Sequence, residues 1–116
     1  FKGYVSDAEL RNLYHSARIN IIPSLYEGFG LTLLEAMSAS APILINEIPV
    51  FNEIAGDFTY KADVRNPQTF AEKISEIYNI KTDTNKLRVQ YDSHLSNFSW
   101  EKCAQQTRNV YEECIK

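Results

Sequence analysis

Residues 23–37 read Pro23-Ser24-Leu25-Tyr26-Glu27-Gly28-Phe29-Gly30-Leu31-Thr32-Leu33-Leu34-Glu35-Ala36-Met37. An apolar, strand-like run at 19–22 comes directly before this segment, and a helical pattern starts near Gly30. A short glycine-containing loop between a strand and a helix leaves backbone N–H groups free at the positive end of the helix dipole. The segment therefore predicts an anion site flanked by two carboxylates, Glu27 and Glu35. This combination suits the phosphates and hydroxyls of a nucleotide-sugar.

Composition limits the classes of protein that this chain can represent. Its 116 residues are enough for one small domain, and 44% hydrophobic with 23% charged residues is ordinary for a globular protein. The net charge of −3 and the lack of a basic block argue against a nucleic-acid partner. No apolar run approaches the ~20 residues of a membrane span, and no signal peptide is evident. Because the first residue is Phe1 rather than Met, the sequence suggests a processed protein or a fragment.

The cysteines and histidines indicate neither a disulfide nor a metal site. Cys103 and Cys114 fall in one predicted helix, ~16 Å apart along its axis, which is too far for a bond between them. Two reduced thiols favour a cytoplasmic protein. His15 and His94 have no Cys or His neighbours at metal-binding spacing, so we expect no metal ligands.

Apolar runs and capping residues predict strands and helices in alternation. Ser6 and Glu9 form a capping-box pattern before a first helix, Asn66-Pro67 begins a later one, and Ser99 begins the last, at about 99–115. On the Asn66-Pro67 helix we expect a buried face of Phe70, Ile74, Ile77 and Tyr78, and we expect Trp100 to anchor the last helix. The predicted strands are the end of one at 1–5, then 19–22, 42–46 and 58–60. Further predicted helices span 30–39, 50–55 and 84–95.

This alternation predicts an α/β fold: a Rossmann-like parallel sheet flanked by helices. Ligands of such sheets bind at the carboxyl ends of the strands. The loop after residue 22 lies at that edge, so the sheet would present the predicted anion site where ligands usually bind.

Several motifs, in their order along the chain, resemble the carboxyl-terminal, donor-binding part of family 4 glycosyltransferases, which have the GT-B fold. The Glu-x7-Glu motif of that family is filled by Glu27 and Glu35, and its context makes the match specific. The matching segments are Gly3-Tyr4-Val5-Ser6-Asp7-Ala8-Glu9-Leu10, residues 23–31, Leu34-Glu35-Ala36-Met37, Ala41-Pro42-Ile43, Asn52-Glu53-Ile54-Ala55-Gly56-Asp57 and Phe98-Ser99-Trp100-Glu101.

The resemblance implies a retaining glycosyltransferase that takes its sugar from a UDP- or GDP-linked donor without a cofactor or an obligate metal. Glu35 would accept hydrogen bonds from the ribose hydroxyls, and Glu27 would act catalytically near the donor sugar. The backbone of Gly28, Phe29, Gly30, Leu31 and Thr32 would meet the sugar and the diphosphate. Tyr4 would lie beside the base.

The same resemblance implies that residues 1–116 are only part of such an enzyme and lack a complete active site. An amino-terminal domain would supply the acceptor site for a glycan or a lipid-linked molecule, as in capsule or lipopolysaccharide synthesis. The Arg and Lys that neutralise the diphosphate in the family have no counterpart here. The whole enzyme would be cytoplasmic, and the resemblance is compatible with its peripheral association with the cytoplasmic face of the membrane.

Two alternatives stay open at this point. A GT-B nucleotide-sugar epimerase or a phosphorylase would keep the fold and change the reaction, although such relatives carry different loops at residues 28–31. A non-catalytic α/β interaction module, such as a flavodoxin-like receiver, would need an acidic cluster after its first strand and a central Asp. The sequence shows neither.

Overall fold

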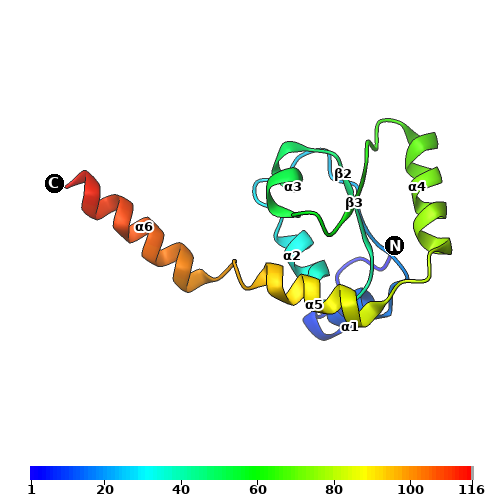
Figure 1. The fold of residues 1–116 in the computed structure, drawn as a ribbon, viewed down its shortest axis with the longest axis horizontal. Coiled ribbons are helices and arrows are strands. Elements are labelled where there is room, and N and C mark those ends of the chain that lie inside the picture. The colour runs from blue at the N-terminus through cyan, green and yellow to red at the C-terminus, as the bar shows by residue number, and fades with distance from the viewer. Residues whose placement is uncertain (116) are drawn as a thin grey trace.

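The computed structural model describes residues 1–115 as a small α/β unit followed by a projecting helix (Figure 1). The predicted caps are confirmed: the side chains of Ser6, Asn66 and Ser99 accept hydrogen bonds from backbone N–H groups in the first turns of α1, α4 and α6. The elements in chain order are α1 (Asp7–Ser16), β1 (Asn20–Ile22), α2 (Leu31–Met37), β2 (Ile43–Asn46), α3 (Pro49–Ile54), β3 (Tyr60–Ala62), α4 (Pro67–Asn79), α5 (Thr84–Leu95) and α6 (Trp100–Cys114).

Within the described residues, the sheet has three parallel strands in the order β1-β2-β3. The register pairs Ile21 with Leu44 and Ile45 with Lys61. The central strand β2 is buried at every position, as expected for a parallel strand covered on both faces. The α/β class with a Rossmann-like parallel sheet is therefore confirmed. All three strands end at the same edge, and this edge carries the loop after β1.

The two faces of the sheet are covered by different helices. On one face, Ile43 and Ile45 pack in a cluster with Leu33 of α2, Phe51 of α3 and Tyr91 of α5. On the other face, Leu44 packs with Ala62 and Ile77, and α4 covers this side. Alternation along β2 sends neighbouring side chains to opposite faces, so one short apolar strand supplies both clusters.

Tyr91 places a hydroxyl inside the larger cluster. The hydroxyl donates to the carbonyl oxygens of Ala41, at 3.3 Å, and Phe58, at 3.4 Å. Burial, followed by the nearby Tyr60, raises the pKa of Tyr91 far above its ordinary value of 10.0. Ionisation of this hydroxyl is therefore much less favourable in the folded chain than in the unfolded chain.

We expect this hydroxyl to make folding stability sensitive to alkali. A raised folded-state pKa gives stability that is fully present below the unfolded pKa and is lost as the pH rises above it. The denaturant midpoint should fall between about pH 8 and about pH 11, and should fall less in Tyr91→Phe. The exposed Tyr111→Phe is the matched control. Equal alkaline losses in wild type and Tyr91→Phe would contradict this assignment.

Helix α6 extends away from the rest of the molecule (Figure 1). Among the described residues it contributes no buried side chain, and Trp100 is 77% exposed. The expectation that Trp100 anchors the last helix is therefore wrong for this structure. Cys103 and Cys114 are both exposed and free, in agreement with the distance argument. No helix within residues 1–115 is both long and apolar enough to cross a bilayer.

Other expectations need correction. Residues 1–5 form no strand: the side chains of this segment are largely exposed, and no strand within the described residues pairs with it. The third strand of the sheet is Tyr60–Ala62 rather than 58–60, because its pairing partners are Leu44–Asn46 of β2. Tyr78 is exposed rather than buried, and the guanidinium of Arg18 lies over its ring, 5.2 Å from the centroid.

The helix expected over 30–39 is shorter, at Leu31–Met37. Gly30 stands before it in the left-handed conformation, with φ 95°. At the other end, the N–H groups of Ser38 and Ala39 donate to carbonyls three residues back, which tightens the chain into a turn.

Candidate functional site

The loop of residues 23–30 joins β1 to α2 at the carboxyl edge of the sheet. Asn46, at the end of β2, is 2% exposed and holds this edge together. Its side-chain amide donates to the carbonyl oxygen of Ser24, at 2.9 Å, and its Oδ1 accepts from the N–H of Val64, at 3.1 Å. One buried side chain thus connects the loop after β1 with the segment after β3.

Glu27 is partly buried in this loop. Its Oε1 accepts a hydrogen bond of 2.7 Å from the Ser24 hydroxyl. Asn46 in turn fixes the carbonyl of Ser24, so the Glu27 carboxylate is linked through Ser24 to the sheet. Within the described residues, Oε2 of Glu27 has no hydrogen-bond partner, which leaves that oxygen available to a ligand.

Glu35 lies on α2 with its side chain exposed. Its Oε2 accepts from the hydroxyl of Tyr14 on α1, at 3.4 Å. Partial burial, then the charge of Glu35 and this hydrogen bond, raise the pKa of Tyr14, which keeps the hydroxyl a neutral donor. A carboxylate has about four acceptor positions, so Glu35 retains capacity for further donors.

The backbone N–H groups of residues 28–32 lie between these two carboxylates in the sequence. Among the described residues, none of these five groups donates a hydrogen bond to the protein. Phe29, Leu31 and Thr32 are exposed, and Phe29 has 46% of its surface accessible. Free donors at the start of a helix are favourable for oxyanions.

The two loop glycines have different roles in the protein. Gly30 is buried with φ +95°, and a Cβ there would lie 3.2 Å from Cε1 of Phe51. At Gly28 a Cβ would meet nothing within 4 Å, and its φ lies outside the left-handed region. The fold therefore requires glycine at position 30, whereas nothing in the protein itself requires glycine at position 28.

Tyr4 is the one predicted site residue that lies outside residues 27–35. It lies in the irregular segment before α1, with its side chain 96% exposed. No hydrogen bond joins its side chain to the loop within the described residues. Its assignment to the base stays a prediction.

Three residues that support the two carboxylates were not predicted to do so. Asn46 gave a usable signal, since a polar residue closes the apolar run Ile43-Leu44-Ile45. Ser24, to which no role was assigned from the sequence, donates its hydroxyl to the Glu27 carboxylate. Nothing in the sequence next to Tyr14 indicates its contact with Glu35, because that contact joins a side chain of α1 to one of α2.

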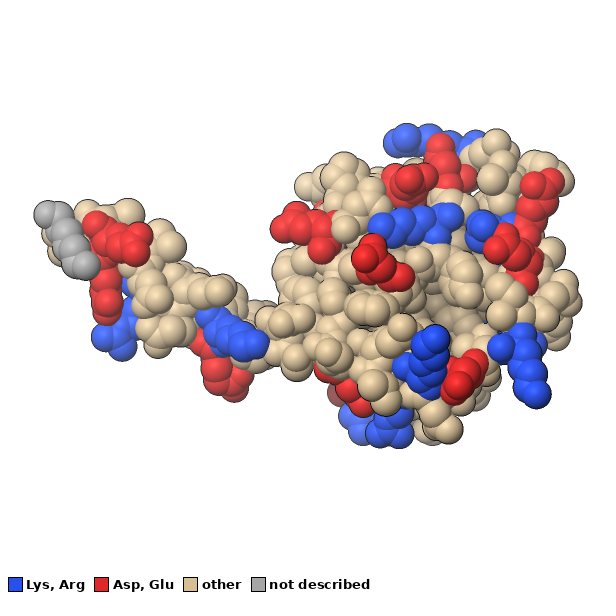
Figure 2. Space-filling model, viewed as in Figure 1, with Lys and Arg blue, Asp and Glu red and all other residues tan. Residues whose placement is uncertain are grey.

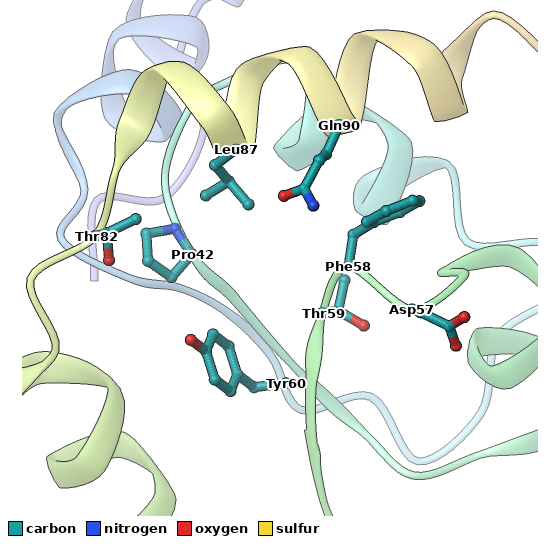
Figure 3. A pocket seen from close by; sticks show the side chains of 8 residues that line it. All are labelled: Pro42, Asp57, Phe58, Thr59, Tyr60, Thr82, Leu87 and Gln90. Carbon is teal, nitrogen blue, oxygen red and sulfur yellow. The ribbon is translucent and has the colours of Figure 1, made fainter.

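Two hollows lie at the opposite, amino-terminal edge of the sheet. The smaller, of about 290 Å³, lies beneath α5, where Leu87 and Gln90 project toward Pro42 and Tyr60 (Figure 3). The larger, of about 590 Å³, includes His15, Arg18 and Lys81, and no carboxylate lines it within the described chain. The face shown in Figure 2 carries positive and negative side chains intermixed.

Comparison with a solved structure identifies the fold to which this chain belongs. Sucrose-phosphate synthase from Thermosynechococcus elongatus, a GT-B glycosyltransferase, superposes with a TM-score of 0.77 over 99% of this chain and 30% of its own, at 22% identity. That likeness concerns the fold. The chain has the fold of part of a GT-B glycosyltransferase.

The family follows from sequence. Residues 1–93 match the family described as glycosyl transferases group 1, and the chain belongs to this family. O-antigen chain mannosyltransferase B of Escherichia coli is 34% identical over 96% of this chain and 29% of its own length. MMP alpha-(1->4)-mannosyltransferase of Mycolicibacterium hassiacum is 34% identical over 96% of this chain and 28% of its own. The chain thus spans under a third of these relatives.

Proposed function

We propose that this chain is the donor-binding part of a retaining glycosyltransferase that uses a nucleoside diphosphate sugar. The observation that carries the proposal is the arrangement along residues 27–35: two carboxylates, each held by one protein hydroxyl, flank five backbone N–H groups without protein partners among the described residues. Family membership supports the same assignment.

Glu35 is the proposed ribose ligand. A carboxylate accepts without donating, so it can bind two vicinal hydroxyls at once. Tyr14 already occupies one acceptor position on Oε2 and restrains the side chain, while Glu35 remains exposed to a ligand.

The diphosphate is assigned to the N–H groups of residues 28–32. Cleavage of the donor leaves negative charge on the diphosphate, and fixed N–H dipoles stabilise such charge without reorganising. The positive end of α2 acts in the same direction. We assign Glu27, whose Oε2 is free among the described residues, to the hydroxyls of the donor sugar, where it would orient the sugar for transfer.

The sugar that we propose is mannose, carried on UDP or GDP. Both compared relatives are named mannosyltransferases, and one of them acts on the O-antigen chain according to its name. We assign the acceptor, a glycan or a lipid-linked molecule, to a domain outside residues 1–116. We place the reaction in the cytoplasm, where the exposed Cys103 and Cys114 stay reduced.

The experiment is a transfer assay on the full-length protein with UDP- and GDP-linked mannose, glucose and galactose. We expect mannose transfer with retained anomeric configuration, read by NMR of the product, and undiminished activity after chelation of metals. An epimerised or phosphorolysed donor would support the alternative reaction of a GT-B epimerase or phosphorylase. A protein that neither binds nor consumes any of these donors would contradict the proposal.

The two loop glycines provide a prediction that separates binding from folding. Gly28→Ala should change the unfolding free energy by less than about 0.5 kcal/mol, because its Cβ has open space. The same change should weaken donor binding roughly tenfold, since the methyl group would enter the space assigned to the donor. Calorimetric titration and denaturant unfolding measure the two effects.

Gly30→Ala is the comparison for the effect on folding. It should lower stability by about 1–2 kcal/mol through its left-handed backbone alone, in addition to the contact with Phe51. Unchanged donor affinity in Gly28→Ala would show that the donor does not approach this glycine.

A further inference from the structure

Four aromatic rings form a row from Phe58, just before β3, to the loop between the carboxylates. Phe29 of the loop meets Phe98 edge-on, with centroids 6.2 Å apart at an interplanar angle of 75°. Phe98 meets His94 at 5.4 Å, and His94 meets Phe58 at 5.4 Å. We call these four residues the aromatic row. Edge-to-face contacts at such distances are attractive beyond the area that they bury.

His94, inside the row, is fixed to the protein. Nε2 of His94 lies 2.7 Å from the carbonyl oxygen of Ile54, at the end of α3. The His94 ring also packs against Gly56, where a Cβ would lie 3.0 Å from its Cε1. His94 is therefore held by a hydrogen bond on one side and by close packing on the other.

Phe98 lies at the joint between α5 and α6 and is partly buried. Its N–H donates to the carbonyl oxygen of Leu95, at 2.9 Å, which continues the turn that ends α5. Ser99 then caps α6. Both the backbone of Phe98 and its contact with His94 thus restrict where its ring can lie.

Phe29 has far fewer restraints. It belongs to no helix or strand, its side chain is 46% exposed, and its N–H has no protein acceptor among the described residues. Phe98 is the one ring described in contact with it. The aromatic contact of Phe29 is therefore with a residue almost seventy positions later in the chain.

We propose that Phe98 is a positioning residue: it holds Phe29, and through Phe29 the backbone N–H groups of residues 28–32, in the conformation that receives the donor. The part concerning the donor rests on the proposed function, whereas the restraint on the loop does not. Because α6 begins at Trp100, directly after this joint, the conformation of the loop also becomes dependent on how α6 leaves α5.

The test compares Phe98→Leu with Phe58→Leu in the full-length protein. Both changes remove one edge contact with His94, but only Phe98 touches Phe29. Limited digestion with chymotrypsin, with cleavage after Phe29 followed by mass spectrometry, reports loop opening without any donor. Thermal midpoints report the general loss of stability, and the donor KM and kcat are measured in parallel.

We expect Phe98→Leu to raise the rate of cleavage after Phe29 by about three- to tenfold and to raise the donor KM by a similar factor. Phe58→Leu should leave both near wild type at a comparable thermal midpoint, and Phe98→Tyr should restore them. His94→Gln, which keeps a polar partner for the Ile54 carbonyl, should show a smaller increase and serves if Phe98→Leu fails to fold.

Equal cleavage in wild type, Phe98→Leu and His94→Gln would overturn the proposal, as would equal acceleration by Phe58→Leu. Faster cleavage in Phe98→Leu alone, in a protein that binds no nucleotide-sugar, would retain the positioning role and reject the proposed function. These two failures are therefore distinguishable.

Discussion

Replacing Glu35 by glutamine is expected to weaken binding of the nucleoside diphosphate donor by about 10- to 100-fold. The substitution keeps the size of the side chain and removes the negative charge, and hydrogen bonds to a charged group contribute about 1.5–3 kcal/mol. Glu35 is exposed and makes one long hydrogen bond, to Tyr14 at 3.4 Å. Folding stability should therefore change by less than about 0.5 kcal/mol. Calorimetric titration of the full-length protein with UDP and GDP measures the effect.

Glu72→Gln is the matched control for this change. Glu72 is an exposed carboxylate on helix α4 that accepts one side-chain hydrogen bond, from Gln68 at 2.7 Å. It resembles Glu35 in exposure and in having one donor, but α4 covers the opposite face of the sheet from α2. Donor affinity should be unchanged in Glu72→Gln. Equal donor affinities in the Glu35 and Glu72 variants would show that Glu35 does not contribute to donor binding.

Replacing Asn46 by alanine is expected to lower the free energy of unfolding by about 2–4 kcal/mol. The change leaves the partly buried Ser24 carbonyl and Val64 N–H without their partner, and each such group costs about 1–2 kcal/mol, the lower part of the range for fully buried groups. Because Ser24 also holds Glu27, donor binding should weaken in the same variant. Denaturant unfolding and titration measure the two losses.

The exposed Asn52→Ala is the comparison for Asn46. It lies within α3, where alanine has a higher helix propensity, so its stability should stay within about 0.5 kcal/mol of wild type. A loss below about 0.5 kcal/mol in Asn46→Ala would show that the two hydrogen bonds do not hold the sheet edge together.

Local sequence signals predicted most of the fold because they are themselves local. The apolar runs around Ile21 and Leu44 became parallel strands, and Ser6, Asn66 and Ser99 became helix caps as predicted. The predicted strand at 1–5 failed because a strand forms only with a pairing partner, and no described strand pairs with this segment. Apolar character alone does not supply that partner.

The supporting contacts of the site depend on residues far apart in the chain. Tyr14 and Glu35 are 21 residues apart, and Asn46 and Ser24 are 22 apart, so no local pattern reveals either pair. The loop residues and both carboxylates were identified by motif, whereas the residues that orient them appear only once the helices pack. Trp100 was misjudged in the opposite direction. Its place at the start of the last helix suggested a buried anchor, and in the structure the side chain is exposed.

The most direct test of the donor site is a crystal structure of the full-length protein with bound UDP or GDP. We predict the ribose hydroxyls within hydrogen-bond distance of the Glu35 carboxylate, and the diphosphate on the N–H groups of residues 28–32. A nucleotide seated elsewhere, such as in the hollow lined by His15, Arg18 and Lys81, with Glu35 free of contact, would contradict the central claim.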